Sequence, residues 1–339
     1  VGVLDVAVNA DVTVTFLVNK QGLFTGYGPS CCGSLILRPL GMQREENLHE
    51  WASARILCRE KLYKIMPSRL NYSCKTNYGH VLVIGGDYGY AGAGIIAAQG
   101  AARTGAGLVS LATRPEHVAA MLTRQPEVMA IGVSSGQELE PFLNRPSVLV
   151  LGPGLGTSAW SEQLLQRALD TKILTVIDAD ALNIISSEKV KISREHAENC
   201  VITPHPGEAA RLLNISVKEV ELDRISAAIK LQKVYGTTVV LKGSGTIVCG
   251  HTSEVVSICP YGNPGMASAG MGDLLSGIIG GLLAQSLSCI SAAELGCCLH
   301  SYAADMMVNQ LGQRGLLATD LLRSISDQLM TPERSGESV

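Results

Sequence analysis

From residue 74 onward, short apolar runs that end in glycine-rich turns alternate with longer segments of helical composition. Two of these runs are "HVLVIGG" at 80–86 and "SVLVLGPGLG" at 147–156. Runs that are apolar at every position are typical of strands covered by helices on both faces. The alternation therefore predicts an α/β fold with a doubly wound, mostly parallel sheet, in which ligands bind beyond the carboxyl ends of the strands.

The remaining elements are expected to continue this pattern. The apolar spacing predicts a helix that begins near Asp273 and one long helix over 217–236. Further strands are expected within 108–113, 173–182, 200–203 and 237–249, and further helices within 91–107, 115–124, 161–170 and 288–311.

The first 73 residues have a different character. Residues 1–42 alternate β-rich runs with turns, and a segment of about forty residues holds too little core to be stable alone. Because the chain opens at Val1 within such a run, we expect an upstream part to be missing from this sequence. Residues 43–73 are polar and are predicted to form a linker with one helix, followed by the main domain at 74–330 and a tail at 331–339.

Composition argues against several classes of partner. The formal net charge of −3 indicates no basic surface, so we expect no nucleic-acid partner. No apolar run reaches the roughly 20 residues that span a bilayer, so we expect no membrane partner. The ten cysteines form no C-x-x-C pair and mostly lie in apolar runs, which is typical of buried free thiols and favours a cytoplasmic location.

The stretch "GNPGMASAGMGDLLSGIIGGLLA" at 262–284 places one carboxylate, Asp273, at the start of an apolar helix. Residues 269–272 have little side chain to obstruct their backbone, so a phosphate could reach the free amides of the helix N-terminus. The alternative is that Asp273 caps the helix. The glycine-rich run is longer than a cap needs, which favours an anion site.

Two more loops follow predicted strands. "LKGSGT" at 241–246 places Lys242 before a glycine turn, which suits either a phosphate contact or an ordinary hairpin. "TPHPGEAARLL" at 203–213 places His205 and Glu208 in a loop stiffened by two prolines. Glu208 could interact with the helix dipole or hold a water of Mg²⁺, and His205 could be an acid–base group, a hydrogen-bond donor or a plain loop residue.

Aspartates and glycines mark the other strand ends. In "VIDADALN" at 176–183, alternate spacing predicts Asp178 and Asp180 on one face of a strand, unless Asp180 caps the next helix. The glycine turns at 84–94 and 151–156 lack the G-x-G-x-x-G spacing, which argues against a nicotinamide-dependent oxidoreductase. Taken together, these loops supply what phosphoryl transfer needs, namely positioning, backbone N–H groups and one base.

Six motifs in this order resemble those of the NAD(P)H-hydrate dehydratases, a ribokinase-like family: "VLVIGG", "GPGLG", "DADALN", "TPHPGE", "KGSGT" and "GNPGMASAGMGDLLSGIIGGLLAQ". The similarity covers about residues 45–330, and the last motif is the most specific. The earlier segment "AVNADVTVTFLVNKQGLFTGYGPSCCG" resembles the closing segment of the NAD(P)H-hydrate epimerase domain of bifunctional repair enzymes.

The resemblance implies a ribokinase-like α/β fold, preceded by a remnant of an α/β epimerase domain, and a lyase reaction. Members of the family phosphorylate the C6 hydroxyl of the S epimer of NADH or NADPH hydrate, and loss of phosphate restores the dihydronicotinamide. The implied phosphoryl donor is ADP, released as AMP, or else ATP, with Mg²⁺. The epimerase acid of the family lies upstream of this sequence, so we expect no epimerase activity from the chain as given.

The resemblance also implies roles for particular residues. Asp273 would deprotonate the hydroxyl, which needs little tuning of its pKa if loss of the phosphoryl group leads. Ala93, Gly156 and His205 match substrate-contacting positions, and Glu208 matches an acid that helps to organise Mg²⁺. The implied nucleotide-binding residues are Lys242, Gly243, Ser244, Gly245, Thr246, Gly270, Met271 and Gly272.

Thr13 lies in the region near the family's potassium site, so K⁺ is a further implied ion. The resemblance also implies a homo-oligomer, with a tetramer as the expected form. Two other functions stay open on the sequence: an ATP-dependent small-molecule kinase of the same fold, of the vitamin or hydroxyethylthiazole type, and a nucleotide sensor without catalysis.

Overall fold

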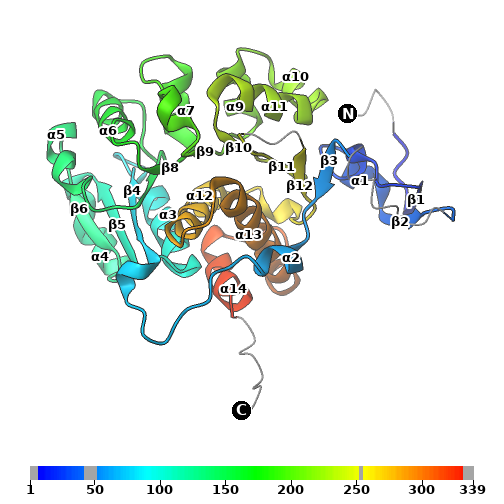
Figure 1. Cartoon of the computed structure of the whole chain (residues 1–339), viewed down its shortest axis with the longest axis horizontal. Helices are drawn as coiled ribbons and strands as arrows, with labels where there is room; N and C mark the ends of the chain where they lie inside the picture. Colours follow the sequence, from blue (N-terminus) through cyan, green and yellow to red (C-terminus); the bar gives the residue numbers. More distant parts are fainter. Residues whose placement is uncertain (1–6, 42–51, 252–254, 331–339) are drawn as a thin grey trace.

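A ten-stranded sheet forms the centre of the structure, a computed structural model that describes residues 7–41, 52–251 and 255–330 (Figure 1). From edge to edge the strand order is β3-β12-β11-β10-β9-β8-β7-β4-β5-β6. In that order the strands are Ala54–Ile56, Val256–Cys259, Thr246–Cys249, Thr238–Leu241, Cys200–Ile202, Leu174–Ile177, Val148–Leu151, His80–Ile84, Leu108–Thr113 and Met129–Gly132.

Nearly all neighbouring strands in this sheet are parallel. Among the described strands, β11 alone runs antiparallel to its two neighbours, β10 and β12, and every other pair is parallel. The predicted mostly parallel α/β sheet is therefore confirmed. Since parallel strands point the same way, the loops that follow them gather at one edge of the sheet, where this fold class binds ligands.

Side chains alternate between two cores, one on each face of the sheet. In β4, Val81 and Val83 belong to the first core, and Leu82 and Ile84 to the second. The first core is covered by α3 (Ala91–Thr104), α4 (Val118–Arg124), α12 (Met271–Ala284), α13 (Cys289–Leu311) and α14 (Leu321–Gln328). The second is covered by α5 (Gly136–Leu139), α6 (Ala159–Leu169), α7 (Ala179–Ser186), α9 (Pro206–Leu213), α10 (Val217–Leu222) and α11 (Arg224–Tyr235).

Helices α3 and α12 pack with their backbones in close contact. A Cβ added to Gly277 of α12 would lie 2.0 Å from the carbonyl oxygen of Ala97. A Cβ added to Gly100 of α3 would lie 2.8 Å from the carbonyl oxygen of Leu274. The glycines of the "SGIIGG" segment therefore let the helix that carries Asp273 lie directly on α3.

Two predictions of local structure are wrong. Residues 217–236 form two helices, not one, because the Asp223 side chain accepts the Ser226 amide hydrogen and begins α11 as its N-cap. Asp178 and Asp180 do not share a strand face, because β8 ends at Ile177 and α7 begins at once.

The region predicted as a linker contains a strand that the sequence analysis did not anticipate. This strand, β3, pairs in parallel with β12 and so extends the central sheet. The single helix expected there is present as α2 (Arg59–Tyr63). Residues 43–51 of that region and the predicted tail at 331–339 lie outside the described residues.

Residues 7–41, called here the N-terminal unit, lie beside the edge of the sheet at β3 (Figure 1). The unit contains two parallel strands, β1 (Val12–Phe16) and β2 (Ser34–Arg38), joined through a 3₁₀ turn at Gln21–Leu23 and helix α1 (Gly28–Cys32). Its origin as the end of an epimerase domain stays a prediction.

All ten cysteines lie in the described part of the chain and carry free thiols. Six of them are buried, at positions 32, 200, 249, 259, 297 and 298, as expected from their apolar surroundings. Of the helices described, none combines the length and apolar character needed to cross a membrane.

Candidate active site

The start of α12 is an uncapped helix tip. Gly270 occupies the N-cap position with a φ of +87°, a left-handed value that suits glycine. No side chain within the described residues caps this end, which leaves its first amides available to bind an anion. Asp273 lies in the first turn and not at the cap, and none of the hydrogen bonds of the described residues involves its carboxylate. The alternative that Asp273 is merely a cap is therefore wrong.

The environment of Asp273 raises its pKa to about 7. Burial is the largest cause, and the negative charge of Asp178 is the next, whereas the ammonium of Lys242 opposes the shift. Whether the reaction needs this shift stays a prediction. Its carboxyl group titrates near neutral pH, where a general base is most effective.

Lys242 follows β10, and its ammonium faces three carboxylates. Its Nζ lies 2.6 Å from Oδ1 of Asp178 and 3.8 Å from Oε2 of Glu208, and it also interacts with the charge of Asp273. Burial opposes the charged ammonium, but Asp178 and Glu208 raise the pKa of Lys242 above its ordinary value. Three carboxylates beside one ammonium leave two negative charges in excess, which a proton on one acid would reduce and a divalent cation would balance.

Asp178 has one carboxylate oxygen without a partner. The Asp178 side chain is buried, and its Oδ2 accepts no hydrogen bond from the described residues. A Cβ added to Gly272 would lie 3.7 Å from this oxygen and 3.3 Å from Nζ of Lys242. Because an unpaired buried carboxylate oxygen is costly, Oδ2 of Asp178 favours a cation or a hydrogen-bond donor supplied by a ligand.

His205 and Glu208 form a capping box at the start of α9. Nδ1 of His205 accepts from the Gly207 amide at 2.9 Å, and the His205 amide donates to Oε2 of Glu208 at 2.7 Å. Burial and the charge of Lys242 lower the pKa of His205. Because Nδ1 accepts a hydrogen bond, the ring carries a proton on Nε2, and this nitrogen lies 3.4 Å from Oε1 of Glu208. Burial also raises the pKa of Glu208, although Lys242 opposes this.

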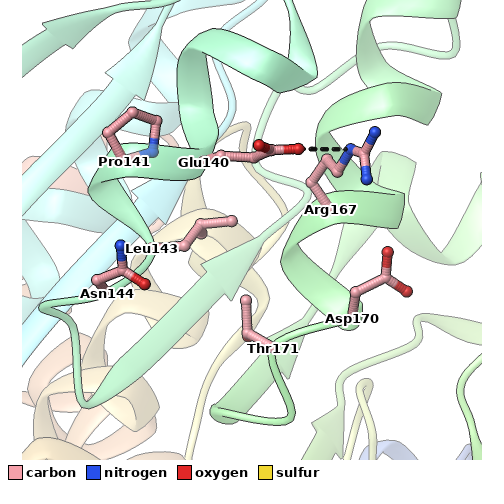
Figure 2. A pocket seen from close by; sticks show the side chains of 7 residues that line it. All are labelled: Glu140, Pro141, Leu143, Asn144, Arg167, Asp170 and Thr171. Carbon is pink, nitrogen blue, oxygen red and sulfur yellow. Dashed lines mark ion pairs between the residues drawn. The ribbon is translucent and has the colours of Figure 1, made fainter.

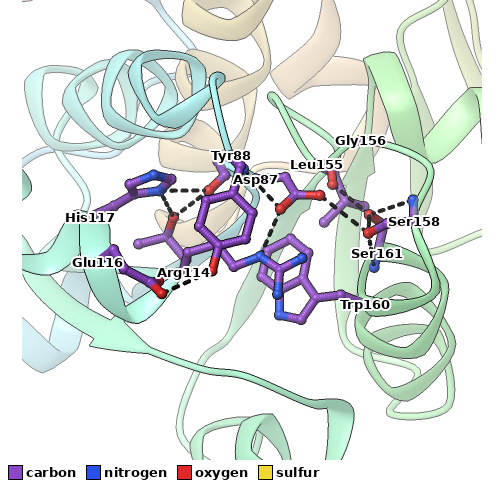
Figure 3. Close-up of polar contacts among 12 residues, drawn as sticks. Asp87, Tyr88, Arg114, Glu116, His117, Leu155, Gly156, Ser158, Trp160 and Ser161 are labelled. Carbon is purple, nitrogen blue, oxygen red and sulfur yellow. Dashed lines mark hydrogen bonds and ion pairs between the residues drawn. The ribbon is translucent and has the colours of Figure 1, made fainter.

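A second network lies after β4 and is shown in Figure 3. Oδ1 of Asp87 accepts from Nε of Arg114 at 2.7 Å and from the Tyr88 amide at 2.8 Å, and Oδ2 accepts from Oγ of Ser158 at 3.2 Å. The Arg114 guanidinium lies between the rings of Tyr88 and Trp160, 4.6 and 4.1 Å from their centroids. Burial alone would raise the pKa of Asp87, but these donors hold it below its ordinary value.

This network borders the predicted substrate positions. A Cβ added to Gly156 would lie 3.0 Å from Oδ2 of Asp87, and one added to Gly154 would lie 3.0 Å from Cβ of Ala93. The Gly156 amide donates to Oδ2 of Asp180 at 2.8 Å, which ties this loop to the start of α7. Gly156 and Ala93 therefore lie around the same loop, although their elements are distant in the sequence.

The structure gathers most of the predicted site residues at the carboxyl edge of the sheet. The exception is Thr13, which lies in β1 and donates its hydroxyl hydrogen to the carbonyl of Cys32 at 2.7 Å. The others lie at strand ends or helix starts of the main domain: Ala93, Gly156, His205, Glu208, Lys242, Gly243, Ser244, Gly245, Thr246, Gly270, Met271, Gly272 and Asp273.

Sequence reasoning did not find His300, in α13. Its Nε2 is buried without a partner among the described residues, and burial with the charge of Lys242 lowers its pKa to about 4. No motif marks it, since it lies inside an apolar helix far from Lys242 in the sequence. The pairing of Asp87 with Arg114 was also missed, because the two residues sit in separate loops.

A surface hollow of about 520 Å³ lies elsewhere, and Figure 2 shows its lining. Arg167 and Glu140 form an exposed ion pair of 3.1 Å there. Asp170 and Thr171 come just before β8, so the hollow is at the opposite end of that strand from Asp178. None of the predicted site residues lines it.

Known proteins resemble this chain in sequence. A family model described as NAD(P)H-hydrate dehydratase matches residues 81–327. The chain is 48% identical over 315 residues to the bifunctional NAD(P)H-hydrate repair enzyme Nnr of Coxiella burnetii, covering 93% of this chain and 63% of that relative. It therefore spans less than two thirds of that protein. It is 37% identical over 265 residues to the ADP-dependent (S)-NAD(P)H-hydrate dehydratase of Neisseria meningitidis serogroup B, covering 76% of this chain and 87% of that one.

Solved structures agree on the fold. A ribokinase-like superfamily protein from Enterococcus faecalis V583 is 29% identical, with a TM-score of 0.74 over 82% of this chain and 95% of that one. The ADP/ATP-dependent NAD(P)H-hydrate dehydratase from Bacillus subtilis, co-crystallised with ATP/Mg²⁺, has a TM-score of 0.71 at 24% identity, over 81% and 97% of the two chains. With the match to residues 81–327, these findings establish that the chain belongs to the NAD(P)H-hydrate dehydratase family and has a ribokinase-like fold.

Proposed function

We propose that this chain catalyses the nucleotide-dependent dehydration of the S epimer of NAD(P)H hydrate to NAD(P)H. ADP is the proposed phosphoryl donor and leaves as AMP, with release of phosphate. The observation that carries the proposal is the free tip of α12 beside Asp273, whose carboxylate has no hydrogen-bond partner among the described residues and whose pKa is raised to about 7.

In the proposed reaction, the carboxylate of Asp273 accepts the proton of the C6 hydroxyl. At the same time the hydroxyl oxygen forms a bond to the terminal phosphorus of the nucleotide. The P–O bond to AMP breaks, and the free amides at Gly270–Gly272 stabilise the negative oxygens of the transferred group. The C6–O bond then breaks with loss of phosphate, and a proton leaves C5 to restore the ring double bond.

The residues around Lys242 fit a nucleotide bound with Mg²⁺. Within the described ranges, no His, Cys, Asp and Glu side chains form a group of three or more able to hold a metal by themselves. Mg²⁺ in phosphoryl-transfer sites usually takes one or two carboxylates, waters and phosphate oxygens. Glu208, with the unpartnered oxygen of Asp178 beside it, supports such a site. The ion would neutralise phosphate charge there, while Lys242 contacts the nucleotide.

The proposed substrate positions are Ala93, Gly156 and His205. The Gly156 turn allows close approach of a ligand because its φ of +71° is a glycine conformation and its amide is already fixed by Asp180. Potassium at Thr13, a homo-oligomer and a cytoplasmic location are further proposals that rest on the family resemblance and the free cysteines.

The test incubates the purified chain with S NADH hydrate, Mg²⁺ and either ADP or ATP, and follows the absorbance of reduced nicotinamide. Recovery of the absorbance that requires nucleotide, with AMP formed from ADP, is the expected result. Phosphorylation of a thiazole or pyrimidine alcohol without recovery would instead support a small-molecule kinase. Nucleotide binding with neither reaction would support a sensor.

A further inference from the structure

The N-terminal unit contacts the glycine turn at 242–246, which joins β10 to β11. The Gly26 amide donates to the carbonyl of Ser244 at 3.0 Å, and the hydroxyl of Thr25 lies 3.2 and 3.1 Å from the carbonyl oxygens of Ser244 and Gly245. A Cβ added to Gly245 would lie 1.8 Å from the carbonyl oxygen of Phe24. The two turns are thus in backbone contact, which only glycine at position 245 permits.

Arg224, the first residue of α11, contacts both of these turns. Its side chain is buried, and the residue is 2% exposed. Its Nε lies 3.0 Å from Oγ1 of Thr25, and its Nη2 lies 3.0 Å from the carbonyl oxygen of Lys242. Its Nη1 pairs with Glu221 at 3.1 Å. One guanidinium therefore bonds both the N-terminal unit and the turn that carries Lys242.

These bonds tie the shape of the turn to the presence of the N-terminal unit. A buried guanidinium is tolerated only when its donors are used, so losing one acceptor leaves a costly unpaired donor. The Thr25 hydroxyl is an acceptor for Arg224 and a donor to the turn, so its removal weakens both contacts. The Lys242 carbonyl would then be less firmly held, and with it the direction of the Lys242 side chain.

We propose that Thr25 and Arg224 are positioning residues through which the docked N-terminal unit sets the nucleotide affinity of the 242–246 turn. The inference rests on the proposed role of this turn in nucleotide binding. Because coupling between two binding events is reciprocal, nucleotide bound at the turn also tightens the docking of the N-terminal unit.

The test uses the full chain with Thr25→Val, which keeps the shape of the side chain and removes the hydroxyl. The matched control is Thr15→Val, because the Thr15 hydroxyl donates to the carbonyl of Val18 inside the N-terminal unit, away from the turn. We expect Thr25→Val to raise the KM for ADP about tenfold, with kcat and the KM for the hydrate within about twofold of wild type. Arg224→Met should raise the KM for ADP further. Arg224→Lys should raise it less than Arg224→Met does, because the lysine keeps a positive charge.

Hydrogen exchange of the Gly26 amide gives a second readout that does not depend on turnover. In wild type, ADP with Mg²⁺ should slow this exchange, and in Thr25→Val the slowing should be largely lost. The coupling would be overturned by an unchanged KM for ADP in Thr25→Val. It would also be overturned if nucleotide did not change the exchange rate of the Gly26 amide in wild type. If Arg224→Met does not fold, Thr25→Val alone decides. A wild-type chain that neither binds nor uses nucleotide would instead refute the proposed function.

Discussion

Two acid clusters lie at the carboxyl edge of one sheet and differ in how their carboxylates are satisfied. Asp87 accepts from Arg114, the Tyr88 amide and Ser158, and its pKa lies below the ordinary value. The carboxylate of Asp273 accepts no hydrogen bond from the described residues, and its pKa is raised to about 7. The comparison teaches that a carboxylate whose oxygens accept several hydrogen bonds stabilises the loops that donate them. A carboxylate without donors is available to take a proton from a ligand.

The largest effect is expected at the unsatisfied acid. Asp273→Asn keeps the size of the side chain but cannot accept a proton, so turnover should fall on the order of 10²-fold or more. The Kd for ADP, measured by titration calorimetry, should stay close to that of wild type. The matched control is Asp170→Asn, which makes the same change at the far end of β8. Comparable turnover in Asp273→Asn would remove Asp273 from the role of base.

The next effect concerns the cation of the same cluster. Lys242→Ala removes the ammonium that lies 2.6 Å from Asp178, and nucleotide phosphates lose their charged partner. We expect the KM for ADP to rise by roughly 10- to 100-fold. Lys172→Ala, at an exposed lysine paired with Glu195, is the control. An unchanged KM for ADP would contradict the nucleotide role of Lys242.

The pH dependence of turnover tests the environment of Asp273. A base must be unprotonated, so wild-type kcat should fall as the pH drops below about 7. Burial, the first cause of the raised pKa, remains in Asp178→Asn, but the second cause, the charge of Asp178, is removed. The acidic limb should therefore move to lower pH by up to about one unit. A limb that stays in place or moves upward would show that Asp178 does not act on Asp273.

The smallest effect is a contrast in stability between the two clusters. The folded pKa of Asp273 lies above its unfolded value, so this carboxyl group destabilises the fold increasingly as the pH rises from about 4 to about 7, and by a constant amount above that. Asp273→Asn should then gain about 1–2 kcal/mol of unfolding free energy at pH 8, and this gain should vanish below the unfolded pKa near 4. Denaturant titrations at the two pH values measure it.

Asp87→Asn should behave in the opposite way. The folded pKa of Asp87 is depressed, so its carboxylate contributes stability at pH 8 that is lost as the pH falls through that pKa. Its replacement should cost about 1–2 kcal/mol at pH 8, because the guanidinium of Arg114 loses a charged acceptor. Equal signs for Asp87→Asn and Asp273→Asn at pH 8 would break the comparison.

The sheet could be predicted because its central strands, such as β4 and β7, are almost continuously apolar, which is typical of strands covered by helices on both faces. The short strand β3 could not, since its three residues lie in a polar stretch and depend on β12 for pairing. The break between α10 and α11 was missed because the capping of α11 by Asp223 interrupts an otherwise continuous helical pattern.

The place of Lys242, Glu208 and Asp273 at the carboxyl edge of the sheet could be predicted, because each lies in one loop or helix start that follows a recognisable pattern. Contacts between residues from distant segments could not be predicted. The contact between Thr25 and Arg224 joins residues separated by 199 positions, and no local pattern indicates it. The raised pKa of Asp273 likewise depends on burial by neighbouring elements, which the sequence near residue 273 does not reveal.

The direct backbone packing of α3 on α12 limits which sequence changes this protein can accept. Main-chain atoms fix the spacing between the acid at residue 273 and the segment that begins α3 at Ala91. A larger residue at Gly277 would displace both helices together rather than adjust one of them. New substrate preferences would therefore have to arise from the loops after β4, β7 and β9, while the distance between these two helices stays constant.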